Sequence, residues 1–400
     1  MLQIDAADFN VAAYRVSTFC YTAQPPFPTT QTPMPSHATA EGTRRFAQRF
    51  DGRAAPGHFR EQQGLSLSSI GIGTYLGDPD ERTDRSYTAA VVAAVSAGVN
   101  FIDSAINYRF QRSERSIAEA LRILNERGFS REEIIVCTKG GYLTPDGGVS
   151  TDSRRYFQEE YLQRGILRIE DVAAGVHCMA PGFLEDQLAR SLSNLGLDCI
   201  DVYYLHNPET QLSAVSRTEF NRRLRDAFVF LESAVTAGRI RFYGLATWNA
   251  FRVAPNSHEF ISLGEAVDLA RDIAGDAHHL RFVQLPFNLA MPEAFTLANQ
   301  MIDGRPATIS EAALRLGITV VASASLLQSQ LVRQLPPVVA EVLGLDSDLH
   351  RALQFARSAP GVTTALVGMS REVHVADNLR LLGVPPAPRE KFLQLFDPVG

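Results

Sequence analysis

Strand-like and helix-like segments alternate along this chain of 400 residues, and this alternation restricts the possible folds more than any other feature. Apolar runs predict the strands, and amphipathic segments that end at glycines such as Gly98, Gly196 and Gly238 predict the helices. The expected strands are 70–74, 99–103, 134–138, 200–205, 240–246, 281–286, 318–322 and 363–367. The expected helices are 83–97, 113–126, 183–195, 217–237, 264–274, 309–316, 349–358 and 371–382.

The order of these segments predicts an α/β fold with a parallel sheet. A strand, a helix and a parallel neighbouring strand form a right-handed crossover, and eight such units can close into a (β/α)8 TIM barrel. The structural alternative is an open, doubly wound sheet. Its usual marker, a GxGxxG loop at the start of the first helix, does not occur at that place in the sequence. We therefore predict the barrel.

One large domain with two additions accounts for the length of the chain, because barrels of this class commonly use about 250 residues or more. Residues 1–57 are expected to form an N-terminal extension that is partly mobile, since 22–42 are rich in Pro and Thr and lack apolar periodicity. Residues 58–400 are expected to form the barrel, with a hairpin at 58–69 that covers its floor.

A long insertion follows the third expected strand. It occupies residues 141–181, which is far more than a usual connection between a strand and a helix. Loops after strands lie on the catalytic face of such a barrel, so the insertion is a candidate lid. Its aromatic residues either line a pocket or only pack the insertion onto the barrel, and they are Tyr142, Tyr156, Phe157 and Tyr161.

The charge and composition favour a small molecule as the partner. A formal net charge of −6 argues against a surface that neutralises nucleic-acid phosphates. No apolar run is long enough to span a membrane, and the N-terminus has acids where a signal peptide has basic residues, so we expect a cytoplasmic protein. The four cysteines show no metal-type spacing and are expected to be reduced thiols. His177-Cys178 and His278-His279 lack a third ligand, so no metal is expected, and the oligomeric state stays open.

Ionisable side chains follow three neighbouring strands of the expected barrel. Asp103 ends the second strand and Tyr108 comes five residues later, while Lys139 and His206 end the third and fourth strands. Each of them alone could be a helix cap, a rim residue or a solvated strand end. Because parallel strands present their carboxyl ends at one face of a barrel, we expect the four side chains to share one site.

These four residue types suit the reduction of a carbonyl group. A tyrosine has an unperturbed pKa of about 10, and a nearby ammonium group lowers it, so that Tyr108 can give a proton to a carbonyl oxygen. Asp103 would balance the charge of Lys139, and His206 could hydrogen-bond the same oxygen. None of these groups supplies a hydride, which implies a nicotinamide cofactor.

The motifs around these residues resemble the aldo-keto reductases, a family of NAD(P)H-dependent enzymes that fold as (β/α)8 barrels. The resemblance covers about residues 60–385 and rests on GIGT, FIDSAINY, VCTKG, LDCIDVYYLHNPE, FVQLPFN and GVTTALVGMSREVHVADNL, which follow the family's order. It implies that Tyr108 is the general acid, with Asp103 and Lys139 tuning it and His206 orienting the substrate. It also implies cofactor contacts from Gly73, Thr74, Thr247, Gln284, Ser323, Gly368, Ser370, Asp377 and Asn378.

One further cofactor contact is expected from Arg371. A guanidinium group suits the 2′-phosphate of NADPH, and Arg371 lies where a helix is expected to begin. NADPH is therefore the expected cofactor, with NADH as the alternative.

The chain departs from the family pattern at three places. Thr247-Trp248 stand where the family commonly has Ser-Asn, and Trp248 becomes a candidate for the substrate pocket. Ser323 stands where the family often has an aromatic residue that stacks on nicotinamide. The spacing from Tyr108 to the next acid, Glu114, is longer than usual. These departures concern the packing around nicotinamide more than the proton chemistry.

Three hypotheses follow for the function. The leading one is an NADP(H)-dependent oxidoreductase that reduces an aldehyde or ketone to an alcohol, with the proton from Tyr108. The alternative is a cofactor-binding regulatory protein that resembles the potassium-channel β subunits and has little turnover. A third and weaker hypothesis is a barrel lyase that uses Lys139 as a Schiff base.

Overall fold

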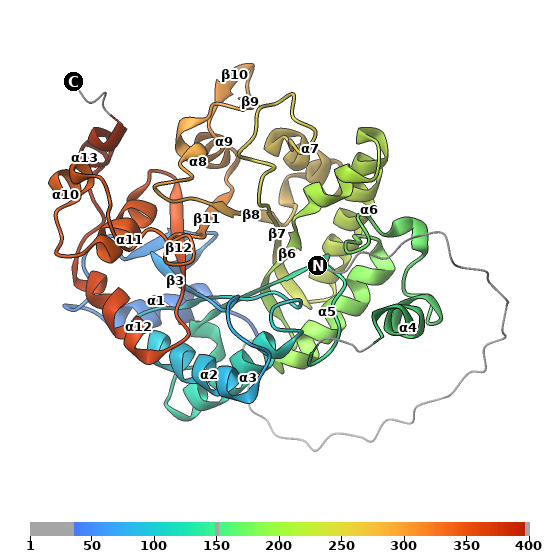
Figure 1. The fold of residues 1–400 in the computed structure, drawn as a ribbon, viewed down its shortest axis with the longest axis horizontal. Coiled ribbons are helices and arrows are strands. Elements are labelled where there is room, and N and C mark those ends of the chain that lie inside the picture. The colour runs from blue at the N-terminus through green and yellow to red at the C-terminus, as the bar shows by residue number, and fades with distance from the viewer. Residues whose placement is uncertain (1–35, 149–151, 397–400) are drawn as a thin grey trace.

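The computed structural model describes residues 36–148 and 152–396 and contains a closed parallel barrel (Figure 1). The strands follow the chain around the barrel, and the last pairs with the first. They are β3 (Ile70–Gly73), β4 (Phe101–Asp103), β5 (Ile135–Gly140), β6 (Ile200–His206), β7 (Ile240–Ala246), β8 (Leu280–Pro286), β11 (Thr319–Ser323) and β12 (Val362–Gly368). The prediction of a (β/α)8 barrel is thereby confirmed, and the open sheet is excluded.

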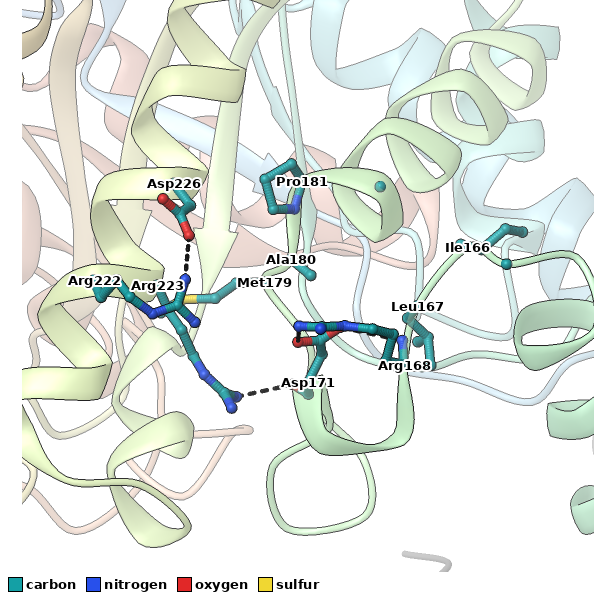
Figure 2. A pocket seen from close by; sticks show the side chains of 12 residues that line it. Ile166, Leu167, Arg168, Asp171, Met179, Ala180, Pro181, Arg222, Arg223 and Asp226 are labelled. Carbon is teal, nitrogen blue, oxygen red and sulfur yellow. Dashed lines mark hydrogen bonds and ion pairs between the residues drawn. The ribbon is translucent and has the colours of Figure 1, made fainter. Parts of the chain in front are cut away.

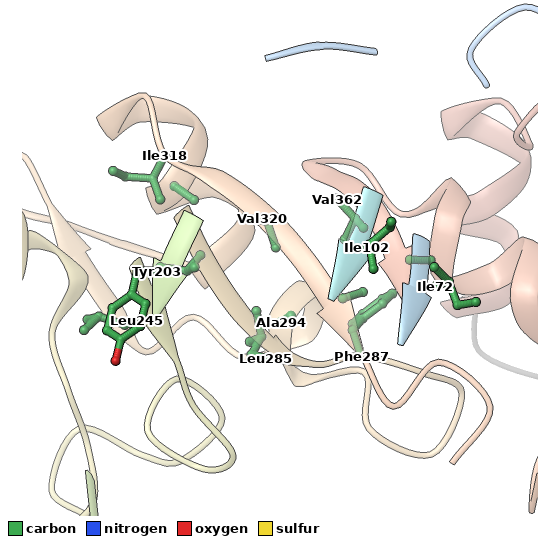
Figure 3. Close-up of a cluster of buried hydrophobic side chains, with 14 of the residues drawn as sticks. Ile72, Ile102, Tyr203, Leu245, Leu285, Phe287, Ala294, Ile318, Val320 and Val362 are labelled. Carbon is green, nitrogen blue, oxygen red and sulfur yellow. The ribbon is translucent and has the colours of Figure 1, made fainter. Parts of the chain in front are cut away.

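A helix follows each strand of the barrel and covers it from outside. These helices are α2 (Glu81–Ser96), α3 (Arg112–Glu126), α5 (Pro181–Leu195), α6 (Arg217–Thr236), α7 (Leu263–Ala274), α9 (Ile309–Leu316), α11 (Asp348–Ser358) and α12 (Glu372–Asn378). Gly196 and Gly317 end α5 and α9 in the left-handed conformation, where glycine has no steric penalty. Side chains on the outer face of the strands, such as Ile72, Ile102 and Val320, are buried in the layer between strands and helices (Figure 3).

The inside of the barrel has a separate apolar core. Its members include Phe101, Val202 and Phe282, which come from different strands. Leu65 and Leu67 from the hairpin of β1 (Phe59–Gln62) and β2 (Leu65–Ser68) belong to the same cluster. Because β2 leads directly into the first strand of the barrel, the hairpin closes the amino-terminal end of the barrel, as the sequence predicted. The carboxyl-terminal end of the barrel is not covered by this hairpin, and the predicted site residues lie there.

Part of the predicted N-terminal extension is folded against this floor. Helix α1 (Ala40–Gln48) buries Phe46, whose ring contacts those of Phe50, Phe59 and Phe129. The amide of Ala38 donates to Asp201 at 2.6 Å, which ties the chain to the start of β6. Residues 1–35, where the prediction of mobility also falls, lie outside the described residues.

Some elements of the structure were not predicted, and three features among them stand out. They are α1, the helix α10 (Pro337–Leu343), and the hairpin of β9 (Gln300–Ile302) and β10 (Arg305–Ala307). The shorter helices α8 (Glu293–Thr296) and α13 (Arg389–Leu393) lie on the outside of the barrel (Figure 1). Among the described residues, no helix combines the length and apolar character needed to cross a membrane. The cytoplasmic location stays a prediction.

The insertion after β5 has a small apolar core of its own. It contains α4 (Ser153–Phe157) and a π-helical turn, Gln158–Leu162, and residues 149–151 lie outside the described part. Phe157 and Tyr161 are buried together with Phe183 of α5, and the Tyr161 hydroxyl donates to Thr144 O at 3.0 Å. These aromatic residues therefore pack the insertion onto the barrel, whereas Tyr142 lies elsewhere, beside His206. The function of the insertion as a lid stays a prediction.

Candidate active site

The four predicted residues lie together at the carboxyl end of the barrel. Asp103 ends β4, Lys139 lies near the end of β5, His206 ends β6, and Tyr108 follows β4 in a loop. The Lys139 Nζ atom lies 2.6 Å from Asp103 Oδ2 and 3.4 Å from the Tyr108 hydroxyl. Two neighbouring strands, β4 and β5, therefore bring the phenol, the ammonium group and the carboxylate to one point.

Lys139 is charged although only 1% of its surface is exposed. Burial lowers the pKa of Lys139, but Asp103 and Tyr108 together raise it more, so the net pKa is raised. A third oxygen, the main-chain carbonyl of Ser104, accepts a hydrogen bond from Nζ at 2.7 Å. A lysine that holds its proton this firmly is a poor nucleophile, which argues against the Schiff-base hypothesis.

Tyr108 keeps its proton in this site. Burial raises the pKa of Tyr108, and the neighbouring Lys139 opposes this effect without overcoming it. Lys139 thus lowers the pKa of Tyr108 as expected, but the net pKa is raised because desolvation of the phenol, which the sequence does not display, is the larger effect. A protonated phenol that touches an ammonium group can still act as a proton donor.

His206 lies beside the phenol without a direct hydrogen bond between the side chains. The two ring centroids are 5.9 Å apart at an interplanar angle of 77°. Burial and the charge of Lys139 hold the pKa of His206 well below its usual value, so the imidazole is neutral. The Nδ1 atom is buried and has no hydrogen-bond partner among the described residues. A neutral imidazole is suited to orient an oxygen atom by one hydrogen bond.

Gln284, on β8, and Thr247, directly after β7, reach the same end of the barrel. The Gln284 side chain donates to Asp103 Oδ1 at 2.8 Å, so it also orients the carboxylate that holds Lys139. The Thr247 amide donates to Gln284 O at 2.8 Å, while its hydroxyl is buried and has no partner among the described residues. Of the two predicted cofactor contacts, Thr247 has the free hydrogen-bonding capacity.

The predicted contacts on β3 and β12 differ in their availability. Gly73 and Gly368 are neighbours in the parallel pairing of these strands, and a Cβ atom on Gly368 would meet nothing within 4 Å. The Thr74 hydroxyl, in contrast, donates to Asp103 O at 3.0 Å and accepts from Ser113 Oγ at 2.6 Å. Thr74 therefore supports the loop that carries the site rather than offering a free hydroxyl.

The predicted adenosine end lies at the start of α12. Arg371 caps this helix, is exposed, and its guanidinium group contacts His374 Nε2 at 2.6 Å. The Ser370 carbonyl accepts a hydrogen bond from Ser86 Oγ at 2.5 Å. Asn378 is buried, and its Oδ1 atom has no partner among the described residues. Asp377 instead accepts a hydrogen bond at its main-chain oxygen from His350, at 2.8 Å.

The remaining predicted contacts lie on either side of the mouth of the barrel. Ser323 ends β11 opposite Pro286, and its carbonyl accepts from the amide of Phe287 at 3.0 Å. Trp248 is 45% exposed, and its amide donates to Glu209 Oε1 at 2.7 Å. The exposed indole is available to a ligand, whereas its backbone is fixed.

Two further aromatic side chains lie at the site: Tyr75, which was not predicted, and Tyr142, one of the candidate pocket residues of the insertion. Tyr75 is 55% exposed, and its ring packs edge-on against that of Tyr108 at 4.9 Å. The ring of Tyr142 packs against that of His206, with 5.0 Å between the ring centroids, and the Tyr142 hydroxyl accepts a hydrogen bond from Asn207 Nδ2 at 3.0 Å. Tyr75 directly follows GIGT, so its place past a strand end was a signal that the sequence interpretation did not use.

The loop after Tyr108 has an unusual backbone. Arg109, Phe110 and Gln111 have φ values of 48°, 56° and 72°, a conformation that glycine tolerates far better than other residues. The Arg109 side chain is ion-paired with Asp84 and hydrogen-bonded to Ser116, and it lies over the ring of Tyr87. These contacts hold the loop between Tyr108 and α3. The long stretch between Tyr108 and Glu114 is thus an ordered turn followed by the start of α3.

A separate pocket lies outside the barrel, between the insertion and the first turns of α5 and α6 (Figure 2). Its volume is about 320 Å³ and its lining includes Arg168, Asp171, Met179, Arg223 and Asp226. None of the four residues at the carboxyl end of the barrel lines it. Within the described residues, no group of three or more His, Cys, Asp or Glu side chains could hold a metal ion.

The described residues form a closed parallel (β/α)8 barrel that gathers a phenol, an ammonium group, a carboxylate and an imidazole at its carboxyl end. Residues 69–261 match the family model described as "Aldo/keto reductase family". Residues 69–261 therefore form an aldo/keto reductase domain.

Curated relatives of the chain include both channel subunits and enzymes. It is 24% identical over 346 residues to a probable voltage-gated potassium channel subunit beta of Oryza sativa subsp. japonica, which covers 81% of this chain and 90% of that protein. It is 28% identical over 209 residues to 6-dehydroglucose reductase of Novosphingobium aromaticivorans, covering 51% of this chain and 56% of that enzyme. It is 25% identical over 209 residues to NADH-specific methylglyoxal reductase of Escherichia coli, and the alignment covers 50% of this chain and 53% of that enzyme. The chain thus spans about half the length of these enzymes.

Solved structures share the fold. An aldo-keto reductase from Bacillus halodurans, in its holo form, superposes with a TM-score of 0.57 at 18% identity, covering 84% of this chain and 95% of that one. An aldo/keto reductase from Klebsiella pneumoniae in complex with NADP and acetate superposes with a TM-score of 0.55 at 19% identity. The superposition covers 85% of this chain and 94% of that one. At this level of identity the likeness concerns the barrel alone.

Proposed function

We propose that this protein reduces an aldehyde or a ketone to an alcohol with a nicotinamide cofactor. The observation that carries the proposal is the position of the Tyr108 hydroxyl, 3.4 Å from Lys139 Nζ, which itself lies 2.6 Å from Asp103. The neutral ring of His206 lies alongside. This set presents one acidic proton and one neutral hydrogen-bonding group to the same small volume.

Each of the four side chains has a distinct part in the proposed reaction. Tyr108 gives its proton to the carbonyl oxygen as negative charge develops there, and the positive charge of Lys139 stabilises the phenolate that remains. Asp103 holds the ammonium group in place, which keeps a charge in a site that would otherwise exclude it. His206 is neutral and orients the carbonyl oxygen toward the phenol.

The residues around the mouth of the barrel fit a nicotinamide dinucleotide. The Thr247 hydroxyl and Asn378 Oδ1 are buried polar atoms without partners among the described residues, and such atoms are costly unless a bound group satisfies them. Gly73 and Gly368 leave an open surface where two strands end. These four residues, with Gln284, Ser323, Ser370 and Asp377, would hold the cofactor, which supplies the hydride when bound.

We propose NADPH rather than NADH as the cofactor. Arg371 is exposed at the first turn of α12, where a guanidinium group can pair with a 2′-phosphate. The Klebsiella pneumoniae structure was determined with NADP, whereas the Escherichia coli relative is named as NADH-specific, so the family uses both. Replacement of Arg371 by Ala should weaken the binding of NADPH more than that of NADH, measured by the fluorescence of each cofactor. Equal weakening would refute this part of the proposal.

The substrate is proposed to be a small carbonyl compound that enters between aromatic side chains. Tyr75 and Trp248 are both exposed on loops that follow strands of the barrel. The relatives named 6-dehydroglucose reductase and methylglyoxal reductase act on carbonyl compounds of very different size. A panel that ranges from methylglyoxal to oxidised sugars is therefore the natural screen.

The test of the proposed function is the replacement of Tyr108 by Phe. Carbonyl-dependent oxidation of NADPH should fall by about 100-fold or more, because general acid catalysis contributes roughly 10² to 10⁴. Binding of NADPH should be unchanged. Tyr75→Phe is the matched control, since it removes a neighbouring phenolic hydroxyl and keeps the stacked ring. Retained turnover in Tyr108→Phe, with a loss in Tyr75→Phe, would overturn the assignment of the acid.

A second candidate function is that of a cofactor-binding regulatory protein. The observation that favours it is the alignment with the Oryza sativa channel subunit, which covers 90% of that protein. Ser323, in place of an aromatic residue, would leave one side of the nicotinamide less covered. The two candidates differ in turnover: tight binding of NADPH with negligible carbonyl-dependent oxidation across the panel would favour the regulatory protein.

A further inference from the structure

We propose that His177, which comes from the insertion, is a positioning residue for His206. This inference rests on the proposed function, because it concerns the residue that orients the carbonyl oxygen. The His177 Nε2 atom lies 2.8 Å from the main-chain oxygen of His206. His177 therefore holds the backbone of the residue whose imidazole takes part in the proposed reaction.

A chain of hydrogen bonds connects this contact to the surface of α6. Arg223 donates from Nε to Glu219 at 2.8 Å and from Nη1 to Gln211 Oε1 at 2.7 Å. Gln211 Nε2 lies 2.8 Å from His177 Nδ1 and also donates to His177 O at 3.0 Å. Arg223 additionally donates to Asp171 O at the pocket of Figure 2. The relay thus runs from Arg223 through Gln211 and His177 to His206.

The proton positions in this relay follow from its two ends. A guanidinium group can only donate, so the oxygen of Gln211 must face Arg223 and its NH2 group must face His177. The Nδ1 atom of His177 therefore accepts, and its proton lies on Nε2, which donates to the carbonyl of His206. A proton on Nδ1 would face the NH2 group of Gln211, which would place two donors opposite each other. Burial holds the pKa of His177 at about 4, so the ring stays neutral at neutral pH.

The backbone around the relay leaves little room for movement. A Cβ atom on Gly141 would lie 2.7 Å from His177 Nε2 and 3.1 Å from His206 O, so only glycine admits this contact. The Gly141 amide donates to Gln187 Oε1 at 2.7 Å, which fixes the start of the insertion to α5. Tyr142 packs edge-on against both imidazole rings, at 5.2 Å from His177 and 5.0 Å from His206.

The carbonyl of His206 needs an anchor because the chain turns there. Asn207 has a φ of 49°, a left-handed conformation, and its amide donates to Ala246 O at 2.6 Å. His206 is thus the last residue of its strand, and its imidazole lies 5.9 Å from the ring of Tyr108. A loss of the anchor would displace this ring from the phenol. Misplacement by about 1 Å can lower a rate by about 100-fold.

The test compares His177→Gln with His177→Asn. A Gln side chain can place an NH2 group where Nε2 lies and so still donates to His206 O, whereas an Asn amide reaches only the Nδ1 position. We expect kcat for carbonyl reduction to fall about 10- to 100-fold in the Asn variant and less than about threefold in the Gln variant. The dissociation constant of NADPH should stay unchanged in both. Equal losses in the two variants would mean that His177 only fills space, and would overturn the inference.

A second measurement does not depend on turnover. In protein labelled with ¹⁵N-histidine, long-range NMR spectra should show His177 with its proton on Nε2 at neutral pH. The His206 ring signals should shift in His177→Asn and stay in place in His177→Gln. If the wild-type protein shows no turnover, the proposed function fails while these spectra still decide the positioning role. Unmoved His206 signals in the Asn variant would refute that role.

Replacement of Gln211 by Glu provides an independent variant. A carboxylate at this place accepts from Arg223 and also from Nδ1 of His177, so His177 should hold a second proton at neutral pH. The imidazolium still donates from Nε2 to His206 O, so the His206 ring signals should move less than in His177→Asn. A His177 signal that titrates as in the wild type would show that the relay does not exist.

Discussion

Replacement of Asp103 by Asn should destabilise the protein through Lys139. At an effective dielectric constant of about 20, two unit charges at the 2.6 Å that separate Nζ and Oδ2 attract by about 6 kcal/mol. Relaxation and partial loss of the lysine proton reduce the penalty, so we expect about 3–5 kcal/mol at pH 7. Asn also turns its NH2 group toward Nζ if its oxygen keeps the hydrogen bond from Gln284.

The pH dependence of this penalty has a defined sign. In the wild type the pKa of Lys139 is raised in the folded state, so its contribution is present below the unfolded value of about 10.5 and is lost above the folded one. Without Asp103, burial should lower the folded pKa below that of the unfolded chain. The free energy of unfolding of the variant should therefore rise with pH toward about 10.5, and the difference from the wild type should narrow.

The assay is urea denaturation followed by circular dichroism at pH 7 and pH 9.5. The matched control is the double variant Asp103→Asn with Lys139→Met, in which no charge is left unpaired. It should recover at least about half of the lost stability, because an unpaired buried charge costs more than the absence of the pair. A penalty below about 1 kcal/mol at pH 7, or equal losses in the single and double variants, would refute the reasoning.

Three further predictions concern the fold and its pH dependence. Gly141→Ala should lower the melting temperature far more than Gly147→Ala. Both glycines have a positive φ, but only at Gly141 would a Cβ atom meet His177, at 2.7 Å. Similar decreases of the melting temperature in the two variants would contradict this prediction. His58 and His177 have folded pKa values of about 4, below the unfolded value of about 6.5, so the free energy of unfolding should rise from pH 4 to 6.5, by up to about 3 kcal/mol for each ring. His177→Gln should remove the part of this rise that His177 contributes. An unchanged dependence of the free energy of unfolding on pH would contradict the prediction for His177. Phe46→Ala should cost about 3–5 kcal/mol in urea denaturation, because the side chain is fully buried among aromatic rings, and a negligible loss would show that α1 is not part of the folded body.

The fold could be predicted because each unit of the barrel has its own local signal. The expected strand 240–246 coincides with β7, and the expected helix 309–316 coincides with α9. Buried parallel strands are continuous apolar runs, and glycines end the helices after them, so periodicity alone locates both. The carboxylate, lysine and histidine at strand ends could be found in the same way.

Other parts of the structure were missed, one because a local signal was overlooked and the rest because they depend on distant residues. The hairpin of β9 and β10 turns at Asp303-Gly304, a strong hairpin signal that the prediction overlooked. Helix α1 follows a Pro-rich stretch, and its burial depends on Phe59 and Phe129, which are distant in the sequence. The role of Gln284 on Asp103 and the raised pKa of Tyr108 depend on burial and packing, which a single sequence does not display.

The left-handed turn at Arg109–Gln111 has a consequence for engineering. Three non-glycine residues in this conformation each cost roughly 1–2 kcal/mol. Arg109 and Gln111 offset that cost with side-chain hydrogen bonds, so a glycine at Phe110 is the change that should make the protein more stable. The same change would give the segment that carries Tyr108 more freedom, and the phenol would spend less time beside Lys139. Substitutions in this loop can therefore raise the stability of the protein more easily than its turnover.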